Sequence, residues 1–110
     1  MKVSIDQPKA NIQQIVLEGR FDVAGTQAVE AQFNAAVAAG PNVIVDLGKV
    51  QFISSVGIRL LVAGAQALSK KGGKMLLMNP DDLTRRILKT TGIDQLIPIC
   101  NGLDEALAKI

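Results

Sequence analysis

The sequence predicts a single α/β domain over residues 1–110, with a mixed β-sheet, an N-terminal hairpin and about four helices in the order β-β-α-β-α-β-α-β-α. Two observations predict this class. Short β-branched or apolar runs alternate with longer stretches whose apolar residues recur at helical spacing. The 110 residues, 48% of them hydrophobic and 20% charged, suit one domain with one core. We therefore expect an α/β sandwich with right-handed crossovers between its parallel strands.

The first third of the chain predicts a hairpin followed by a helix. Met1–Ile5 and Ile12–Glu18 favour β-structure, and the residues between them include Pro, Asp and Asn, which suit a turn. The two runs therefore predict an antiparallel hairpin. An Ala-rich stretch from about Gly25 to Ala39 predicts the first helix, which Gly40-Pro41 ends. Its apolar residues fall on one face: Val29, Phe33, Ala36 and Val37.

The middle of the chain predicts a central strand and a second helix. Asn42–Asp46 is short and β-branched, as is typical of a strand buried on both faces. Leu47–Gln51 is polar and turn-prone, and leads through Phe52-Ile53 to a helix that begins at Ser54-Ser55. Lys70–Gly73 ends this helix with basic residues and a glycine pair. The apolar stripe of the helix comprises Ile58, Leu61, Val62, Ala65 and Leu68.

The last third predicts two strands and two helices. Lys74–Met78 is a buried strand, and Asn79-Pro80 begins a third helix that ends at Gly92. Ile97–Cys100 is the last strand, and residues 101–108 form a short closing helix capped by its Asn. The apolar positions of the third helix are Leu83, Ile87 and Leu88.

Missing residue types exclude whole classes of function. The chain has no His, so Ser-His-Asp and Cys-His catalysis and His-containing zinc sites are excluded. Cys100 is the only Cys and predicts a buried structural thiol rather than a reactive one, so we expect no metal and no cofactor. With no Trp or Tyr and only three Phe residues, the chain lacks a stacking platform for bases, so nucleic-acid binding is not expected.

The chain also shows no signal for a membrane or for export. No apolar run approaches the roughly 18 residues that a bilayer span needs. The N-terminus lacks a basic segment followed by an apolar one, so nothing directs secretion. We therefore expect no membrane insertion and a cytoplasmic location.

Two segments carry polar residues at the carboxyl ends of expected strands, where α/β proteins place their sites. They are Gly19–Asp22 and Asp46–Gly57. Ser54 and Ser55 come where the second helix begins, and Gly57 would let another molecule approach its first turn. One reading is that a Ser simply caps the helix. The other is that a Ser accepts a phosphoryl group, which the free amides and partial positive charge of a helix N-terminus would favour.

The charged residues have ordinary interpretations beside functional ones. Asp22 is either a turn residue or part of a partner-binding site, and Asp46 either bonds its own loop or joins that site. The two carboxylates do not indicate a hydrolase, because no substrate cleft can be inferred around them. Six basic residues form a cluster: Lys70, Lys71, Lys74, Arg85, Arg86 and Lys89. The cluster either is a solvated face with favourable charge at helix C-termini or meets an acidic partner.

Four separated stretches resemble, in order, the motifs of STAS domains of the bacterial anti-sigma factor antagonist type. The signature is Asp46–Leu61, which contains Ile-Ser-Ser-Val-Gly-Ile-Arg. Leu17–Asp22 resembles the family's Gly-x-x-Asp turn, Gly72–Pro80 its fourth strand, and Leu88–Asp94 its Leu-x-x-Thr-Gly-Leu-Asp corner. The resemblance spans nearly the whole chain and implies a STAS-like sandwich.

The resemblance implies a non-enzymatic partner switch. The unphosphorylated antagonist binds an anti-sigma factor that is also a serine kinase, phosphorylation releases it, and a PP2C-type phosphatase reverses the modification. Aligned on Gly57, the phosphoacceptor is Ser55. The chain has Ser54 where the family often has Asp, so either Ser54 or Asp22 is left to orient the Ser55 hydroxyl. The implied partner-binding residues are Asp22, Ser54, Ser55, Val56, Gly57, Ile58 and Arg59.

Two further expectations concern the site. Arg59 follows Ser55 by four residues, on the same helix face. We expect it to contact the partner or to pair with the phosphate once added, and the ordinary alternative is an arginine exposed to solvent. The same fold would also suit a role other than the partner switch. In that role the chain is a non-phosphorylated STAS subunit of a lipid-trafficking ABC transporter or of a stressosome-like scaffold. The presence of Ser55 favours the switch.

Overall fold

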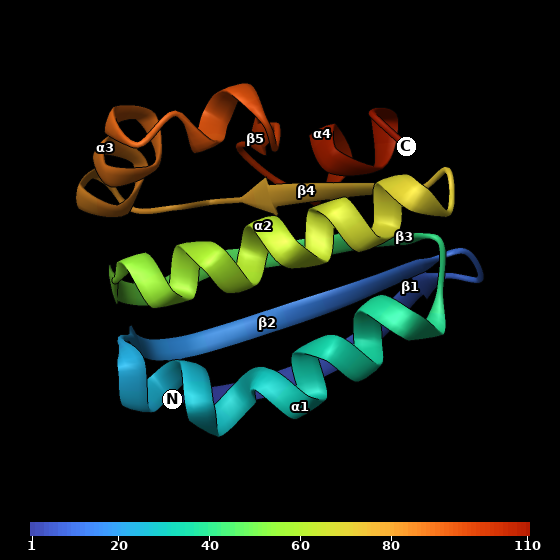
Figure 1. The fold of residues 1–110 in the computed structure, drawn as a ribbon. Helices are drawn as coiled ribbons and strands as arrows, with labels where there is room; N and C mark the ends of the chain where they lie inside the picture. The colour runs from blue at the N-terminus through green and yellow to red at the C-terminus, as the bar shows by residue number, and fades with distance from the viewer.

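The computed structural model describes all of residues 1–110 and contains one five-stranded mixed sheet (Figure 1). The strands lie side by side in chain order, with β1 and β2 antiparallel and the remaining pairs parallel. They are β1 (Lys2–Lys9), β2 (Ile12–Phe21), β3 (Asn42–Ile53), β4 (Lys74–Met78) and β5 (Ile99–Cys100). The predicted α/β class, the N-terminal hairpin and the order of elements are confirmed.

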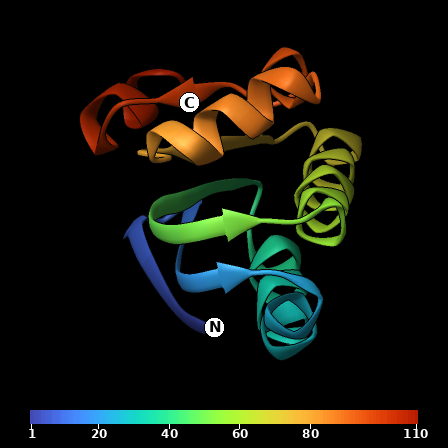
Figure 2. The same ribbon diagram turned by 90° about the vertical axis from the view of Figure 1, so that its left-hand side faces the viewer.

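Four α-helices flank the sheet: α1 (Val23–Ala39), α2 (Ser55–Lys70), α3 (Asp82–Thr90) and α4 (Leu103–Ala108). Helices α1 and α2 cover one face, and α4 lies on the other (Figure 2). A short 3-10 helix, η1 (Ile93–Gln95), connects α3 to β5. None of these helices combines the length and the apolar character that crossing a membrane requires.

The strands divide their side chains between two apolar clusters, as the two-residue period of a strand requires. In β3, Val43 and Val45 face α1 and α2, whereas Ile44 faces the α4 side. The α1–α2 cluster contains the four apolar residues predicted for the first helix, Leu61 and Leu68 of the second, and also Leu60. Of the predicted stripe of α2, Ile58, Val62 and Ala65 are only partly buried.

Strand β3 is much longer than the sequence predicts. Leu47–Gln51, expected as a turn-prone connection, continues the strand to Ile53 and pairs with β2. Leu47 and Val50 are buried, which holds this polar stretch against the core. Two register shifts between β2 and β3 accommodate the irregular backbone. The prediction of a loop here is wrong because tertiary pairing outweighs local turn propensity.

The N-terminal hairpin is also longer than expected. Strand β1 runs to Lys9 and includes Pro8, and the turn is reduced to Ala10-Asn11. Proline is acceptable in β1 because this strand is at the edge of the sheet, where an amide can be missing without breaking a ladder.

Three predictions near the C-terminus need correction. Leu83, expected on the buried stripe of α3, is 51% exposed, because α3 turns Thr84 and Leu88 inward instead. The last strand begins at Ile99 rather than Ile97. The predicted Asn cap of α4 is absent, because Gly102 occupies the cap position. The backbone N–H of Asn101 instead donates to the Glu105 carboxylate.

Cys100 lies fully buried in the smaller cluster, as predicted. Burial raises the pKa of this thiol above its ordinary value, and the nearby Glu105 carboxylate adds to the effect while Lys109 opposes it. A thiol held in its neutral form is a poor nucleophile, so the structure supports a structural role.

One residue of the basic cluster, Lys71, caps the C-terminal end of a helix. The Lys71 ammonium donates to the carbonyl oxygens of Val37 (2.8 Å) and Gly40 (3.2 Å), at the end of α1. A cation there satisfies carbonyl groups that the helix leaves unpaired. For Lys71, the ordinary interpretation therefore holds.

The glycine pair after α2 serves two different purposes. Gly72 has a φ of 79°, in the left-handed region that favours glycine at the end of a helix. Gly73 has no such φ, but a Cβ there would overlap the carbonyl group of Pro41. The entry into β4 thus packs directly on the turn before β3.

We expect Gly73→Ala to lower the free energy of unfolding by about 1–3 kcal/mol, because the added methyl group must displace rigid backbone. Gly40→Ala is the control, since its backbone is extended and a Cβ there would meet only the flexible Gln13 side chain, 3.6 Å away. This control should change stability by less than about 0.5 kcal/mol. Urea denaturation followed by circular dichroism measures both. Equal effects would contradict the proposed packing role of Gly73.

Candidate functional site

The ends of β2 and β3 bring the predicted site residues together. Phe21 and Ile53 lie opposite each other in the parallel register of β2 and β3. Asp22 and Ser54, the residues that follow them, therefore lie at neighbouring strand ends. The Ser54 amide donates to the Phe21 carbonyl oxygen at 2.9 Å, and the Ser54 hydroxyl donates to the same oxygen at 3.1 Å. These two bonds attach the start of α2 to the end of β2.

Ser54 is the residue that caps α2. Its backbone is extended, with φ −94° and ψ 170°, and its hydroxyl oxygen accepts from the Gly57 amide at 3.3 Å. The first-turn amides of a helix have no partner within the helix, and a capping hydroxyl satisfies one of them. The capping interpretation therefore applies to Ser54, whose hydroxyl is already used as both donor and acceptor.

Ser55 differs from Ser54 in its exposure and in its hydrogen bonding. It is the first residue of α2, it is exposed, and its hydroxyl makes no hydrogen bond in the structure. A phosphate on this hydroxyl would sit at the positive end of the helix dipole, near amide groups that the helix leaves unpaired. The geometry therefore leaves Ser55 available and Ser54 engaged.

Asp22 caps α1 rather than orienting Ser55. Its Oδ1 accepts from the Gly25 amide at 2.8 Å, and its Oδ2 lies 3.6 Å from Nε of Arg20. The Arg20 guanidinium also lies over the Phe52 ring, 4.6 Å from its centroid. Neither the Asp22 carboxylate nor the Ser54 hydroxyl bonds to Ser55. The expectation that Asp22 or Ser54 orients the Ser55 hydroxyl is therefore wrong in this structure.

Gly57 is buried and faces the interior. A Cβ at this position would lie 3.0 Å from both Cγ and the carbonyl oxygen of Phe21, so the absent side chain leaves room for this ring. The expectation that Gly57 admits another molecule is wrong, because Phe21 fills that space. Gly57 instead shapes the site from beneath by letting α2 approach β2 closely.

Asp46 does not belong to the site. It lies in β3, eight residues before Ser54, and its Oδ1 accepts from the Gly48 amide at 2.9 Å. Strand residues advance about 3.3 Å each, so most of the length of β3 separates Asp46 from the start of α2. The backbone-bonding interpretation of Asp46 is confirmed.

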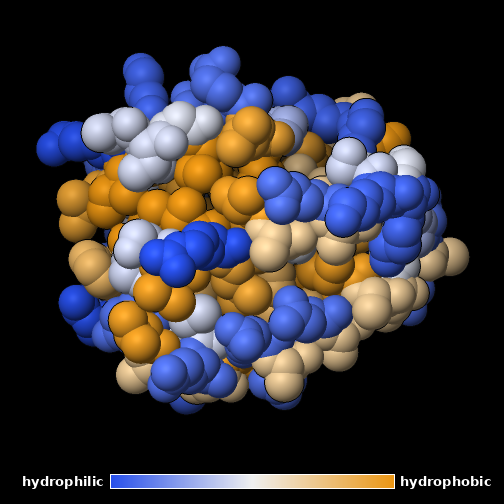
Figure 3. All heavy atoms as spheres, in the orientation of Figure 1, coloured by the Kyte–Doolittle hydropathy of each residue, from blue (hydrophilic) through white to orange (hydrophobic).

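The surface around Ser55 is largely apolar. Helices α1, α2 and α3 all begin at the same end of the sheet (Figure 1). Val23 at the start of α1 is 52% exposed, and Leu83 at the start of α3 is 51% exposed. Val56 and Ile58 are partly exposed between them, and Arg59 is exposed. Hydrophobic residues gather over the first half of α2 and toward α3 (Figure 3), the kind of patch that marks an interaction site.

Sequence reasoning missed Val23 and Leu83 as parts of this surface. Leu83 was assigned to the core by helical periodicity, and Val23 lay before the expected start of the first helix. The available signal was an apolar residue next to an Asp at a helix start: Val23 follows Asp22, the cap of α1, and Leu83 follows Asp82, the first residue of α3. Only the helix directions show that both side chains point outward.

No group of three or more Asp, Glu, Cys or His residues is placed to hold a metal ion.

The family model for the STAS domain matches residues 7–106. The chain belongs to the STAS domain family. The anti-sigma-F factor antagonist RsfB of Mycobacterium tuberculosis is 27% identical over 93 residues, which cover 84% of this chain and 75% of RsfB. A protein similar to this chain over most of its length is thus named an anti-sigma factor antagonist.

Solved structures agree with the fold. An anti-sigma factor antagonist from Mycobacterium paratuberculosis superposes with a TM-score of 0.88 at 28% identity, over 99% of this chain and 92% of that chain. SpoIIAA of Bacillus, at 19% identity, superposes with TM-scores of 0.83 in its unphosphorylated form and 0.75 in its phosphorylated form. These superpositions cover 98% of this chain, and 95% and 98% of the two SpoIIAA chains.

The different tasks of the two serines predict different stability effects. Ser54→Ala removes the cap of α2 and one bond to Phe21, and should lower the free energy of unfolding by about 1 kcal/mol. Ser55→Ala removes an exposed hydroxyl without a partner and should change stability by less than about 0.5 kcal/mol. Urea titrations of the two variants, each compared with the unmodified chain, test this. A larger loss in Ser55→Ala would show that the assignment of the cap is wrong.

Proposed function

We propose that this STAS domain is an anti-sigma factor antagonist that acts by switching partners and has no catalytic activity of its own. In its unphosphorylated state it binds a serine-kinase anti-sigma factor, phosphorylation of Ser55 releases it, and a PP2C-type phosphatase restores binding. One observation carries the proposal. The exposed, unbonded hydroxyl of Ser55 stands at the start of α2 within an apolar surface.

The physical basis of the switch is the desolvation of a phosphate. Phosphorylation adds about 1.5 to 2 negative charges to a surface that otherwise presents Val23, Val56 and Ile58. A docked partner would have to strip water from that charge, and an unpaired buried charge is strongly unfavourable. In the free domain the helix N-terminus and water stabilise the same phosphate. The modification therefore changes docking while the fold persists.

The predicted binding residues divide into those that touch a partner and those that support the contact. Val56 and Ile58 offer apolar contact beside Ser55, and Arg59 offers a charged group one turn along the helix. Ser54 and Gly57 hold the helix start against Phe21. The proposed surface therefore comprises Asp22 at its rim, Ser54, Ser55, Val56, Gly57, Ile58 and Arg59, together with Val23 and Leu83.

Relatives support the proposal in two ways. RsfB is named an anti-sigma-F factor antagonist, and its match covers most of both chains. SpoIIAA, which shares the fold, is named an anti-sigma factor antagonist and has been solved both without and with its phosphate. An anti-sigma factor acts on the transcription machinery, so the proposal places the protein in the cytoplasm, without direct contact to nucleic acid or membrane.

The role of Ser55 can be tested with a cognate serine kinase, ATP and phosphosite mapping. We expect phosphate on Ser55 and a loss of affinity for the kinase partner of at least about a hundredfold, because a desolvated phosphate opposes docking by several kcal/mol. Ser55→Ala should bind constitutively and resist phosphorylation, and Ser55→Asp should weaken binding only in part. Ser69→Ala, which alters an exposed serine near the far end of α2, is the matched control.

Two results would contradict the assignment: phosphate on Ser54, or unchanged binding after stoichiometric modification of Ser55. A constitutive subunit of a transporter or scaffold would show no phosphorylation, and its contact through the same helix surface would not be regulated by a kinase. Mass spectrometry combined with calorimetry separates these cases.

Arg59 offers a second, independent test. Arg59→Ala should weaken partner binding by about threefold to tenfold, the range that a charge at the rim of an interface supplies. Arg59→Lys should recover part of the loss, since it keeps the charge and loses the planar donor fork. Gln66→Ala, at an exposed position about two turns further along α2, controls for changes in the helix itself. If Arg59→Ala alters neither affinity nor dephosphorylation, Arg59 is merely a solvated residue.

A further inference from the structure

The outer edge of β4 is open over part of its length. All five residues of β4 pair with β3, but only Leu77 and Met78 pair with β5. The Lys74 amide points toward β3, where it donates to Oδ1 of Asn42 at 3.0 Å, and the Leu77 amide points outward, to the Pro98 carbonyl at 2.9 Å. Because backbone groups alternate along a strand, the N–H and C=O of Met75 also point outward, where no strand lies.

Pro98 explains why β5 stops where it does. In a parallel ladder, the residue whose carbonyl accepts from Leu77 would donate its own amide to the carbonyl of Met75. That residue is Pro98, which has no amide hydrogen. The ladder therefore ends at this point, and the carbonyl of Met75 loses the partner that a longer β5 would have supplied.

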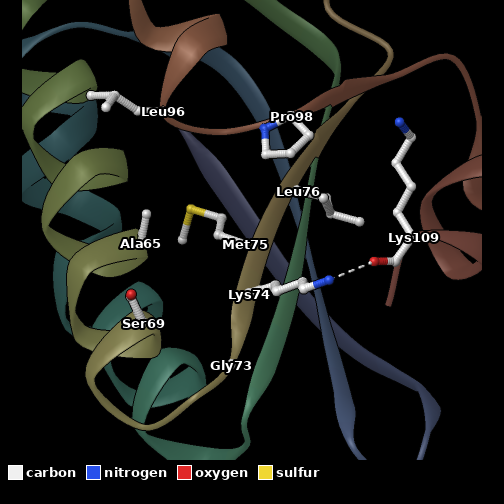
Figure 4. A pocket seen from close by; sticks show the side chains of 9 residues that line it. All are labelled: Ala65, Ser69, Gly73, Lys74, Met75, Leu76, Leu96, Pro98 and Lys109. Atoms are coloured by element: carbon white, nitrogen blue, oxygen red, sulfur yellow. Dashed lines mark hydrogen bonds between the residues drawn. The ribbon is translucent and has the colours of Figure 1, made fainter.

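A cavity of about 440 Å³ lies along this open edge (Figure 4). Its floor is β4 itself, around Met75 and Leu76. Ala65 of α2 lines one side, and Lys109 at the end of α4 lines the other. Leu96, which is 67% exposed and the most exposed large apolar residue of the chain, closes one end. The edge thus forms a slot with a helix on each side, rather than a bare strand.

The two sides of the slot differ in chemistry. Met75 faces the α2 side and packs in the larger apolar cluster, whereas Leu76 faces the α4 side. Lys74 shares the face of Leu76, and its ammonium donates to the Lys109 carbonyl oxygen at 3.2 Å (Figure 4). Both lysine side chains are exposed, neither makes an ion pair, and no carboxylate lines the cavity. The α2 side is therefore apolar and the α4 side is cationic.

We propose that this slot binds an extended acidic segment of a partner protein, which adds a strand to β4 in line with β5. The segment would run antiparallel to β4, so that one of its residues exchanges both bonds with the N–H and C=O of Met75 and directs an apolar side chain toward Ala65 and Leu96. The residues on either side of it would point to the opposite face, where acidic side chains meet Lys74 and Lys109. Main-chain bonds supply affinity in such strand addition, and alternate side chains supply specificity. The slot selects an apolar residue flanked by acidic ones.

This site is separate from the surface around Ser55. Ser55 begins α2, and Ser69, which also lines the cavity, lies fourteen residues later. At about 1.5 Å per residue, roughly 20 Å of helix separates them. The slot can therefore be occupied whether or not Ser55 is phosphorylated, and the two proposals can fail independently.

The test uses the full chain, labelled with ¹⁵N, and a blocked seven-residue peptide that alternates glutamate and valine. We expect the peptide to slow hydrogen exchange of the Met75 amide at least about tenfold, as a new backbone bond protects it, while the Ser55 amide is unaffected. The double variant Lys74→Glu/Lys109→Glu should weaken binding of this peptide by about tenfold or more. The same variant should bind a peptide with lysine in place of glutamate more tightly than the unmodified chain does.

The matched control is Lys49→Glu/Lys89→Glu, which changes the net charge equally at exposed lysines away from the slot and should leave binding unchanged. Four results would overturn the proposal: no protection of Met75, equal binding of the glutamate and lysine peptides, peptide-induced shifts centred on the start of α2, or protection of Met75 by self-association without peptide. The last would assign the slot to a second copy of this chain. Unchanged ¹H–¹⁵N spectra away from the mutated sites verify that each variant is folded.

Discussion

The arrangement of the proposed switch depends on the contact between Phe21 and the first turn of α2. The Phe21 carbonyl oxygen accepts from both the amide and the hydroxyl of Ser54, and the Phe21 ring occupies the space that Gly57 leaves empty. These contacts join the end of β2 directly to the start of α2, which follows the neighbouring strand β3. Because the helix start cannot move without breaking them, the neighbouring residue Ser55 is held at the surface with its hydroxyl free.

Because Ser54 and Ser55 have different roles, a modification at the start of α2 need not unfold the helix. The cap, which stabilises the helix, belongs to Ser54, and the exposed hydroxyl belongs to Ser55. A phosphate on Ser55 therefore removes no hydrogen bond that the fold uses. It adds charge where the helix dipole favours it in the free domain and where a docked partner would have to desolvate it. In the proposed switch, phosphorylation of Ser55 would therefore weaken binding while leaving the fold stable.

The two edges of the sheet are protected to different degrees. Strand β1 carries Lys2, Pro8 and Lys9, features that discourage pairing with another chain. At the other edge, Pro98 shortens β5 and leaves Met75 with unpaired backbone groups between two helices. Lys74 and Lys109 repel a basic strand there and attract an acidic one. This edge therefore admits an acidic strand and disfavours a basic one. For that reason we assign it a partner distinct from the one at Ser55.

The sequence by itself determined the order of elements, the core positions of the first helix and Ser54-Ser55 as the start of the second, because periodicity and capping act over a few neighbouring residues. It did not reveal that β3 continues through Leu47–Gln51, since that strand depends on pairing with β2. Nor did local pattern separate the two serines. Only the tertiary structure decided that Ser54 is bound to Phe21, that Gly57 faces inward and that Leu83 faces outward, because each depends on a residue distant in the chain.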